Sequence, residues 1–399
     1  MSPLALLFAL AFLVSVDLRI LAPVLPSISA SLGSPPGIVG LAMTTYSLAY
    51  GTGQLLYGPL SDRRGRIVVV RAAGLAFSAC CVLSALATTT WQFIAARLLA
   101  GAFAGAVIPL TLVYIGDTVE YGQRQTVLGR FSALTSCALA FSASIGGTVA
   151  YLVSWRVMLI GYGTLALIPV CLMWRLEPVR PQAGATPSNS AGQFASLCRD
   201  PRARAVYLAV FLEGSLVWGG ATYIGAFGAV RHGLDQLTVG LLFALVGVGT
   251  MTGGLLLGRV RRVLSENALA RVGGSLMGAG YLLLIPRWPW PLFAVSMLAL
   301  GLGYAGLHTT LQVRGTELSA GSRGTAFALF AFFLFAGIAI GTGVLGRLVD
   351  RGSYEAAFAA AGIGLAGIGL WTGRPAGHGA AGGGARLAAG SPPRLQDRA

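Results

Sequence analysis

The stretch TGQLLYG at residues 52–58 returns as TGGLLLG at residues 252–258, an offset of 252 − 52 = 200 positions. The same offset joins further pairs: Gly33 with Gly233, Gly40 with Gly240, Leu41 with Leu241, Gly101 with Gly301, and Asp117 with Glu317. Chance pairing of glycines does not explain a seven-residue block in register with several other matches. The chain is therefore predicted to be a tandem duplication.

Composition places this duplicated chain in a membrane. Hydrophobic residues make up 55% of it and charged residues only 10%, against about 25% charged in a soluble domain, and the mean hydropathy is +0.75. Continuous runs near the ~20 residues that cross a bilayer as a helix occur in two sets of six, which excludes an alternating barrel pattern. They lie at about 4–27, 38–60, 67–87, 91–115, 126–151, 155–175, 204–230, 237–258, 268–286, 291–312, 323–348 and 355–372.

The two sets define the expected domains of an all-α membrane protein. Residues 1–175 form an N-terminal six-helix bundle and residues 204–373 a C-terminal one. Residues 176–203 are expected to be a cytoplasmic linker, because their first part is rich in Pro, Ala, Gly and Ser. Residues 374–399 hold almost no large apolar side chain, which predicts a disordered tail.

Arginine placement predicts the orientation. The 28 basic residues are all Arg, and most of them flank the connections that lie on the same side as both termini. By the positive-inside rule, both termini and the central loop are expected to be cytoplasmic, in a bacterial inner (plasma) membrane. The net charge of +15 is then mainly a topology signal, and a nucleic-acid partner is not expected, since no aromatic platform accompanies it.

The sequence contains no residue pattern typical of a cofactor site or of an enzyme active site. The cysteines and histidines show no metal-ligand spacing, so neither a metal site nor a disulfide is predicted. A nucleotide loop of the Walker type is impossible because the chain has no Lys. No cofactor is expected, and a membrane enzyme is disfavoured.

The connection after the second run is the most specific local signal. It reads GPLSDRRGR at residues 58–66. It is similar to the cytoplasmic loop signature G-x-x-x-D-R-x-G-R of the major facilitator superfamily, with every fixed position present: Gly58, Asp62, Arg63, Gly65 and Arg66. The resemblance implies twelve helices in two pseudo-twofold-related bundles and a loop that holds the inner gate closed, with Asp62 near the N-terminus of the eleventh helix.

Weaker matches resemble the 12-helix drug:proton antiporters of that superfamily. Asp17 and Pro26 are spaced as in the first-helix motif, although Ala22 replaces its usual Asn, and Arg97 with Gly101 resembles the fourth-helix basic motif. The fifth-helix antiporter motif survives only as small residues, Gly146 and Gly147 among them, without its Gly-Pro bend. Gly101, Gly146 and Gly147 are expected to permit tight helix packing.

Charges inside the spans are the functional candidates, because a charge at the bilayer centre persists only if it is paired or faces water. Asp17 is expected to carry a proton, and Arg97 to control how readily it is protonated; the alternative is a static ion pair that fixes packing. Glu213 is a second candidate proton site. Arg19 lies about 200° around the helix from Asp17, and the sequence assigns it no partner.

The substrate cavity is expected to be aromatic. Tyr46, Tyr50 and Gln54 recur at helical spacing on the second span, as either a cavity stripe or a packing stripe. Further cavity candidates lie on the seventh and tenth spans: Trp218, Tyr223, His308 and Gln312. Few charges and many rings suit amphipathic or weakly cationic organic molecules.

These features together predict a monomeric transporter that exports a small organic molecule, drug-like or metabolite, across the lipid bilayer by proton-coupled alternating access. Because the fifth-helix antiporter motif is only partly present, a proton symporter or a facilitative uptake carrier for a sugar or organic acid remains an alternative. A receptor or scaffold that transports nothing is the alternative of another class, and it predicts that neutralising Asp17 leaves function intact.

Overall fold

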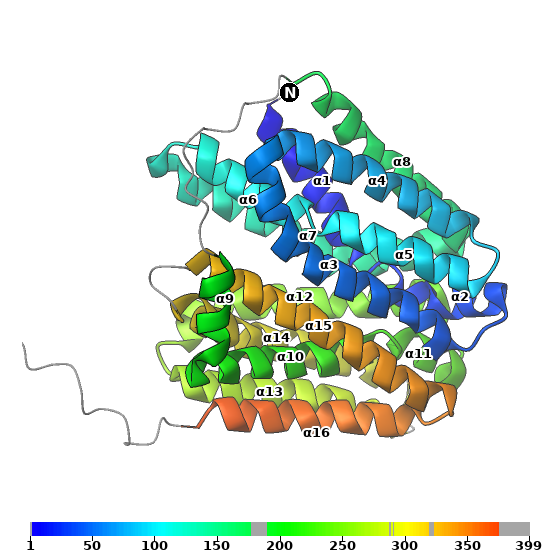
Figure 1. The fold of residues 1–399 in the computed structure, drawn as a ribbon. Helices are drawn as coiled ribbons and strands as arrows, with labels where there is room; N and C mark the ends of the chain where they lie inside the picture. The colour runs from blue at the N-terminus through cyan, green and yellow to red at the C-terminus, as the bar shows by residue number, and fades with distance from the viewer. Residues whose placement is uncertain (1, 177–189, 287–288, 290, 319–322, 375–399) are drawn as a thin grey trace, which may run out of the picture.

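The structure is a computed structural model that describes residues 2–176, 190–286, 289, 291–318 and 323–374. Within these residues every regular element is a helix, as Figure 1 shows. The helices of the first half are α1 (Pro3–Asp17), η1 (Ala22–Val24), α2 (Leu25–Leu32), α3 (Pro36–Arg64), α4 (Arg66–Leu86), α5 (Thr90–Ala104), α6 (Val107–Thr118), α7 (Tyr121–Leu152) and α8 (Trp155–Met173). Those that follow are α9 (Ser190–Arg199), α10 (Pro201–Ala221), α11 (Ile224–His232), α12 (Gln236–Val260), α13 (Glu266–Leu282), α14 (Pro291–Glu317), α15 (Arg323–Asp350) and α16 (Tyr354–Thr372).

Three of the spans are interrupted helices. The first comprises α1, η1 and α2, the fourth α5 and α6, and the seventh α10 and α11. The break in the first span begins after Asp17, where α1 ends, and Pro23 lies inside it in η1, where it lacks the N–H that a continuing helix would use. Ten spans among the described residues are long and apolar enough to cross a membrane, and α3 and α13 complete two sets of six. The predicted all-α membrane fold is confirmed.

The repeat explains how the first and seventh spans end. Gly33 follows α2 with φ 61°, and Gly233 follows α11 with φ 63°. Glycine adopts this left-handed conformation without the steric cost that a Cβ imposes, so both helices stop at the same point of the repeat. The offset pairing seen in the sequence is thus a pair of equivalent helix C-caps.

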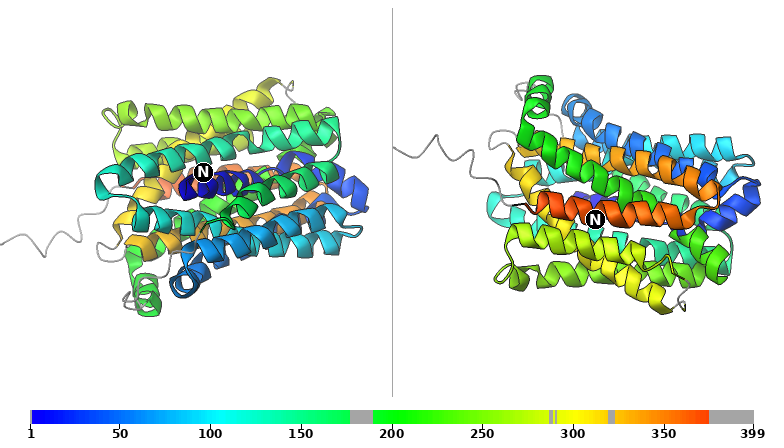
Figure 2. Two further views of the ribbon diagram at one scale, coloured as in Figure 1. Left: turned by 90° about the horizontal axis from the view of Figure 1, so that it is seen from above. Right: turned by 90° about the horizontal axis from the view of Figure 1, so that it is seen from below.

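Four helices form most of the contact between the two halves. α3 packs on α15, and α7 packs on α12. The offset of 200 residues maps α3 onto α12 and α7 onto α15, so the two contacts are equivalent under the repeat. Figure 1 shows the halves as two helical layers lying against each other, and Figure 2 looks onto them from above and from below.

The halves meet at one end of the molecule and diverge at the other. Hydrogen bonds between them lie toward the end that carries α2 and α11: Asp350 Oδ1 accepts from the Gly37 N–H at 2.6 Å, Ser144 Oγ donates to the Gly240 carbonyl at 2.8 Å, and the Gln236 amide contacts Ser27 Oγ. Toward the other end, a Cβ added at any of three interface-helix glycines, Gly58, Gly129 or Gly258, would meet nothing within 4 Å. We call these the closed end and the open end.

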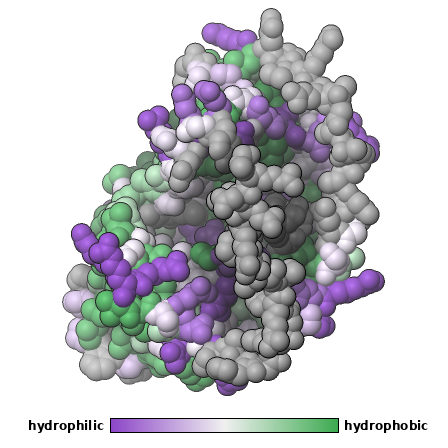
Figure 3. Space-filling model, turned by 90° about the vertical axis from the view of Figure 1, so that its left-hand side faces the viewer, coloured by the Kyte–Doolittle hydropathy of each residue, from purple (hydrophilic) through white to green (hydrophobic). Residues whose placement is uncertain are grey.

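The open end is rich in arginine. Arg63 and Arg64 at the end of α3 are exposed, as are Arg259, Arg261 and Arg262 at the end of α12. Figure 3 looks onto this end and shows hydrophilic residues spread over it. The helix α9 also lies here, packed on α10 and α15. It falls in the expected linker 176–203, for which no helix was predicted, while residues 177–189 and the expected tail from residue 375 lie outside the described residues.

Candidate functional site

Asp17 and Arg97 form a buried pair inside the N-terminal bundle. Arg97 on α5 donates from Nη1 to Asp17 Oδ1 at 3.1 Å and from Nη2 to Oδ2 at 2.7 Å. The side chains are 2% and 0% exposed, and the guanidinium carbon lies 4.5 Å from the centroid of the Tyr46 ring. Two parallel charge-assisted hydrogen bonds are the strongest geometry for such a pair. The structure therefore brings together the two residues that the sequence nominated for proton coupling.

Glu213 has a partner that the sequence did not assign to it. His308 Nδ1 on α14 lies 2.9 Å from Glu213 Oε2 on α10, and the Glu213 side chain is fully buried. The other carboxylate oxygen, Oε1, has no hydrogen-bond partner among the described residues. His308 stands here as the partner of a buried acid, in addition to its predicted place in the cavity. A buried acid beside a histidine can exchange a proton without leaving an isolated charge.

A row of aromatic rings continues from this pair. The His308 ring stacks on Tyr304, with centroids 4.5 Å apart, and Tyr304 meets the edge of Trp218 at 5.1 Å. Tyr304 and His308 are one helical turn apart on α14, which explains the stacking. The Arg19 guanidinium lies over the face of the Trp218 ring, and its carbon is 3.6 Å from the ring centroid. Arg19 thus reaches from the N-terminal half into the C-terminal half.

The aromatic stripe of α3 divides between two environments. Tyr46 and Tyr50 are almost fully buried, and the Tyr50 ring lies 4.5 Å from the Phe335 ring of α15. Gln54, one turn closer to the open end, is partly exposed, as is Gln312 on α14. Tyr223 is fully buried at the closed end, where its hydroxyl donates to the Thr342 carbonyl at 2.8 Å. The same ring lies against Gly40 of α3, so Tyr223 packs the two halves together at the end where they meet.

The loop signature forms a local network at the open end. Arg66 pairs with Asp62, donates from Nε to Asp117 Oδ2 at 3.2 Å, and donates to Ser61 Oγ at 2.5 Å. Gly65 has φ 90° and ψ 141°, a region that side chains strongly disfavour, which explains the glycine. Asp62 is thus paired within its own half. Residues 319–322, which precede its expected partner at the start of α15, lie outside the described residues.

Gly58 makes no close helix contact in this structure. A Cβ at this position would meet nothing within 4 Å, because Gly58 lies where the halves diverge. The Arg63 side chain is exposed at the open end.

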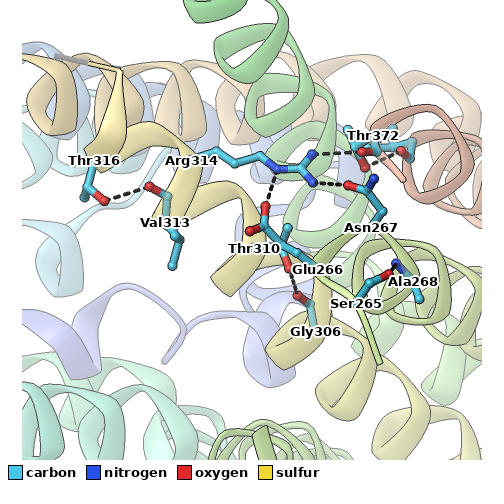
Figure 4. A network of polar contacts seen from close by, with 11 residues as sticks. Ser265, Glu266, Asn267, Ala268, Gly306, Thr310, Val313, Arg314, Thr316 and Thr372 are labelled. Atoms are coloured by element: carbon cyan, nitrogen blue, oxygen red, sulfur yellow. Dashed lines mark hydrogen bonds and ion pairs between the residues drawn. The ribbon is translucent and has the colours of Figure 1, made fainter. Parts of the chain in front are cut away.

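The C-terminal half has a polar network at the equivalent place, but an acidic residue stands there in the position of a basic one. Glu266 begins α13 at the position that Arg66 holds in α4, since 266 − 66 = 200. Figure 4 shows Arg314 of α14 bonded to three residues from two helices: Glu266 at 2.6 Å, Asn267 at 2.9 Å and the Thr372 carbonyl at 2.8 Å. In the N-terminal half the basic residue of the ion pair is Arg66, which follows the loop, whereas in the C-terminal half it is Arg314 on α14. Each half therefore has its own ion pair at this end.

The three glycines nominated for packing lie at close helix contacts. A Cβ at Gly101 would meet the backbone of Tyr46, and one at Gly146 would meet the backbone of Ile20. Gly147 lies at the interface between the halves, where a Cβ would come within 3.0 Å of the Gly240 Cα. Close backbone approach of this kind is typical of helices that pack in a membrane. In the described part of the chain, His, Cys, Asp and Glu form no group of three that could hold a metal ion.

Comparison with known proteins identifies the family. Residues 7–342 match the model of the Major Facilitator Superfamily. The chain is 26% identical to a chloramphenicol resistance protein of Pseudomonas aeruginosa over 84% of this chain and 81% of that one. It is 25% identical to a probable sugar efflux transporter of Helicobacter pylori (strain G27) over 79% and 80% of the two chains.

Solved structures agree on the fold. The nucleoside transporter NupG superposes with a TM-score of 0.76 at 12% identity, covering 93% of this chain and 98% of that one. A D-xylose–proton symporter superposes with a TM-score of 0.71 at 17% identity, covering 93% and 95%. Members of this family are transporters that bind small molecules, not enzymes, and many are coupled to protons. The chain, a multi-pass membrane protein with two equivalent six-helix halves, belongs to the Major Facilitator Superfamily.

Proposed function

We propose that this transporter exports a small organic molecule, drug-like or metabolite, by proton-coupled alternating access, with Asp17 as the proton carrier. The observation that carries the proposal is the Asp17–Arg97 pair, which is buried at the middle of the first span and makes two hydrogen bonds. Protonation of Asp17 neutralises the carboxylate and weakens its hold on Arg97. A proton can therefore favour one conformation over another through its differential binding to the two.

Glu213 is proposed as a second proton site. One of its oxygens contacts His308, and the other has no hydrogen-bond partner among the described residues, so protonation of that second oxygen would leave the existing bond in place. Efflux is favoured as the direction because two relatives are a chloramphenicol resistance protein and a probable sugar efflux transporter. Proton-coupled uptake of a sugar or organic acid is the alternative, and the sign of proton movement separates the two.

The orientation belongs to the same proposal. Exposed arginines at the open end favour a cytoplasmic location for that end, and with it for both termini, in the bacterial inner membrane. The structure then corresponds to a carrier open to the cytoplasm. A monomer is proposed as the working unit, because each half completes its own acid–base pair. No nucleic-acid partner is proposed.

The decisive experiment uses the purified protein in liposomes that contain a pH-sensitive dye. Chloramphenicol and a panel of sugars are added, and both substrate-dependent proton movement and exchange of labelled for unlabelled substrate are recorded. Asp17→Asn is expected to abolish the proton movement but to keep the exchange, because exchange needs no net protonation step. Glu213→Gln is compared in parallel.

Two controls separate coupling from packing. Asp235→Asn changes a carboxylate that caps α12 at the surface, so it should leave proton movement unchanged. The double variant Asp17→Asn with Arg97→Gln removes both charges. If Asp17 only fixes packing, the single variant loses exchange as well and the double variant regains proton-coupled transport, which would overturn the proposal.

A further inference from the structure

Arg19 is a charged side chain for which the described residues supply no anion. Its backbone lies between the end of α1 and η1, where the first span is interrupted. The guanidinium makes no hydrogen bond or ion pair with any described residue, and its Nε is buried without a partner. Both oxygens of the nearby Asp17 are committed to Arg97. A cation at this depth persists only if it is paired or reaches water.

Among the residues that the structure describes, two other arginines also lie on tryptophan rings, and they show what Arg19 lacks. The Arg71 guanidinium lies over Trp174 and donates to the Met173 carbonyl at 3.3 Å. Arg156 lies over Trp155 and donates to the Ala85 carbonyl at 2.5 Å. In both cases a backbone oxygen accepts from the guanidinium. Arg19 has the ring alone, so its in-plane N–H groups remain available to an acceptor from outside the protein.

The geometry also suits an organic ligand. The Trp218 ring covers one face of the guanidinium and is held in place by the edge contact with Tyr304. The planar edge of the guanidinium matches a carboxylate or phosphate through two parallel hydrogen bonds. Trp218 and Tyr304 offer apolar area for the rest of the molecule. Glu213 of α10 contacts His308, which is separated from Trp218 by Tyr304 in the row of rings.

We propose that Arg19 and Trp218 form the binding site for an anionic group of the transported molecule, so that the substrate class is an aromatic or amphipathic organic anion. The inference rests on the proposed transport function. The proposed substrate is an anion, whereas the sequence favoured a weakly cationic molecule. The difference arises because the sequence assigned Arg19 no partner. Because Arg19 comes from one half and Trp218 from the other, a bound anion would bridge the two halves.

The test measures binding without a proton gradient. Benzoate, cinnamate and naphthoate are compared with benzamide, cinnamamide and naphthamide, using the rise in melting temperature of the full chain in nanodiscs at neutral pH. At least one carboxylate is expected to bind about tenfold (about 1.4 kcal/mol) more tightly than its amide. Arg19→Gln should abolish this preference, and Arg19→Lys should reduce it because lysine lacks the planar fork.

Arg71→Gln is the matched control, because it removes another arginine that lies on a tryptophan, and it should leave the preference unchanged. The ratio of carboxylate to amide affinity is the readout, since a general loss of stability affects both ligands alike. If no carboxylate binds better than its amide, or if the preference survives in Arg19→Gln, the inference is wrong. Asp17-dependent proton movement in liposomes would still stand in that case, so failure of the anion site and failure of proton coupling are distinguishable.

Discussion

His308 Nδ1 lies 2.9 Å from Glu213 Oε2, and this pair joins the first helix of the C-terminal half to the fourth span of that half. The N-terminal half does the same with Asp17 and Arg97. Each half thus connects its first and fourth spans through one buried acid and one basic partner. Glu213 corresponds to residue 13 under the offset, one turn from Asp17, so the two acids sit at similar depths.

The Glu213–His308 pair should contribute to stability as a unit. His308→Leu leaves a buried carboxyl without its partner, and breaking a buried pair in this way costs about 3–5 kcal/mol. The double variant Glu213→Gln with His308→Leu is expected to recover most of that loss, because no buried charge remains. Thermal unfolding in detergent measures both. Equal losses in the single and double variants would show that the pair is not coupled.

Gly65 should tolerate no side chain. Its φ of 90° lies in a region that is strained for any residue with a Cβ, so Gly65→Ala is expected to cost about 1–3 kcal/mol. Gly58→Ala is the matched change in the same loop signature, and it should be close to neutral because the site is open. Comparison of the two melting temperatures tests this. A larger loss at Gly58 would contradict the structure.

Gly101 should be equally sensitive for a different reason. A larger residue there would push α5 away from the backbone of α3 at Tyr46. Overpacking a core typically costs about 1–3 kcal/mol, and Gly101→Leu is expected to destabilise the N-terminal half by at least this amount. It should also separate Arg97 from Tyr46. Gly116→Leu, at a position with nothing within 4 Å, serves as the control. Yield of folded protein on size-exclusion chromatography reports the difference.

Orientation can be read from cysteine labelling. Gly58→Cys at the open end and Ser31→Cys at the closed end are introduced into a chain whose five cysteines are replaced by Ser or Ala. A membrane-impermeant maleimide is expected to label Gly58→Cys in inside-out vesicles and Ser31→Cys in intact cells. The reverse pattern would place the arginine-rich end outside the cytoplasm and overturn the proposed orientation.

The sequence by itself determined the number and place of the spans, the duplication and the loop signature. These depend on properties that are local in the chain, namely the length of apolar runs, a fixed offset, and a short motif of consecutive residues at 58–66. Asp17 and Arg97 could be paired in advance because each is a costly charge in a span and only a few partners are available.

For the other contacts across helices, only the tertiary structure decided which residues meet. Glu213 and His308 are 95 positions apart, and Arg19 meets Trp218 in the other half of the molecule. Such contacts depend on how far each helix is rotated and shifted along its neighbour, and helical periodicity specifies neither quantity between different helices. The same reason applies to the closed end, where Tyr223 proved to be a packing residue between the halves because the interrupted seventh span brings its ring against α3 and α15.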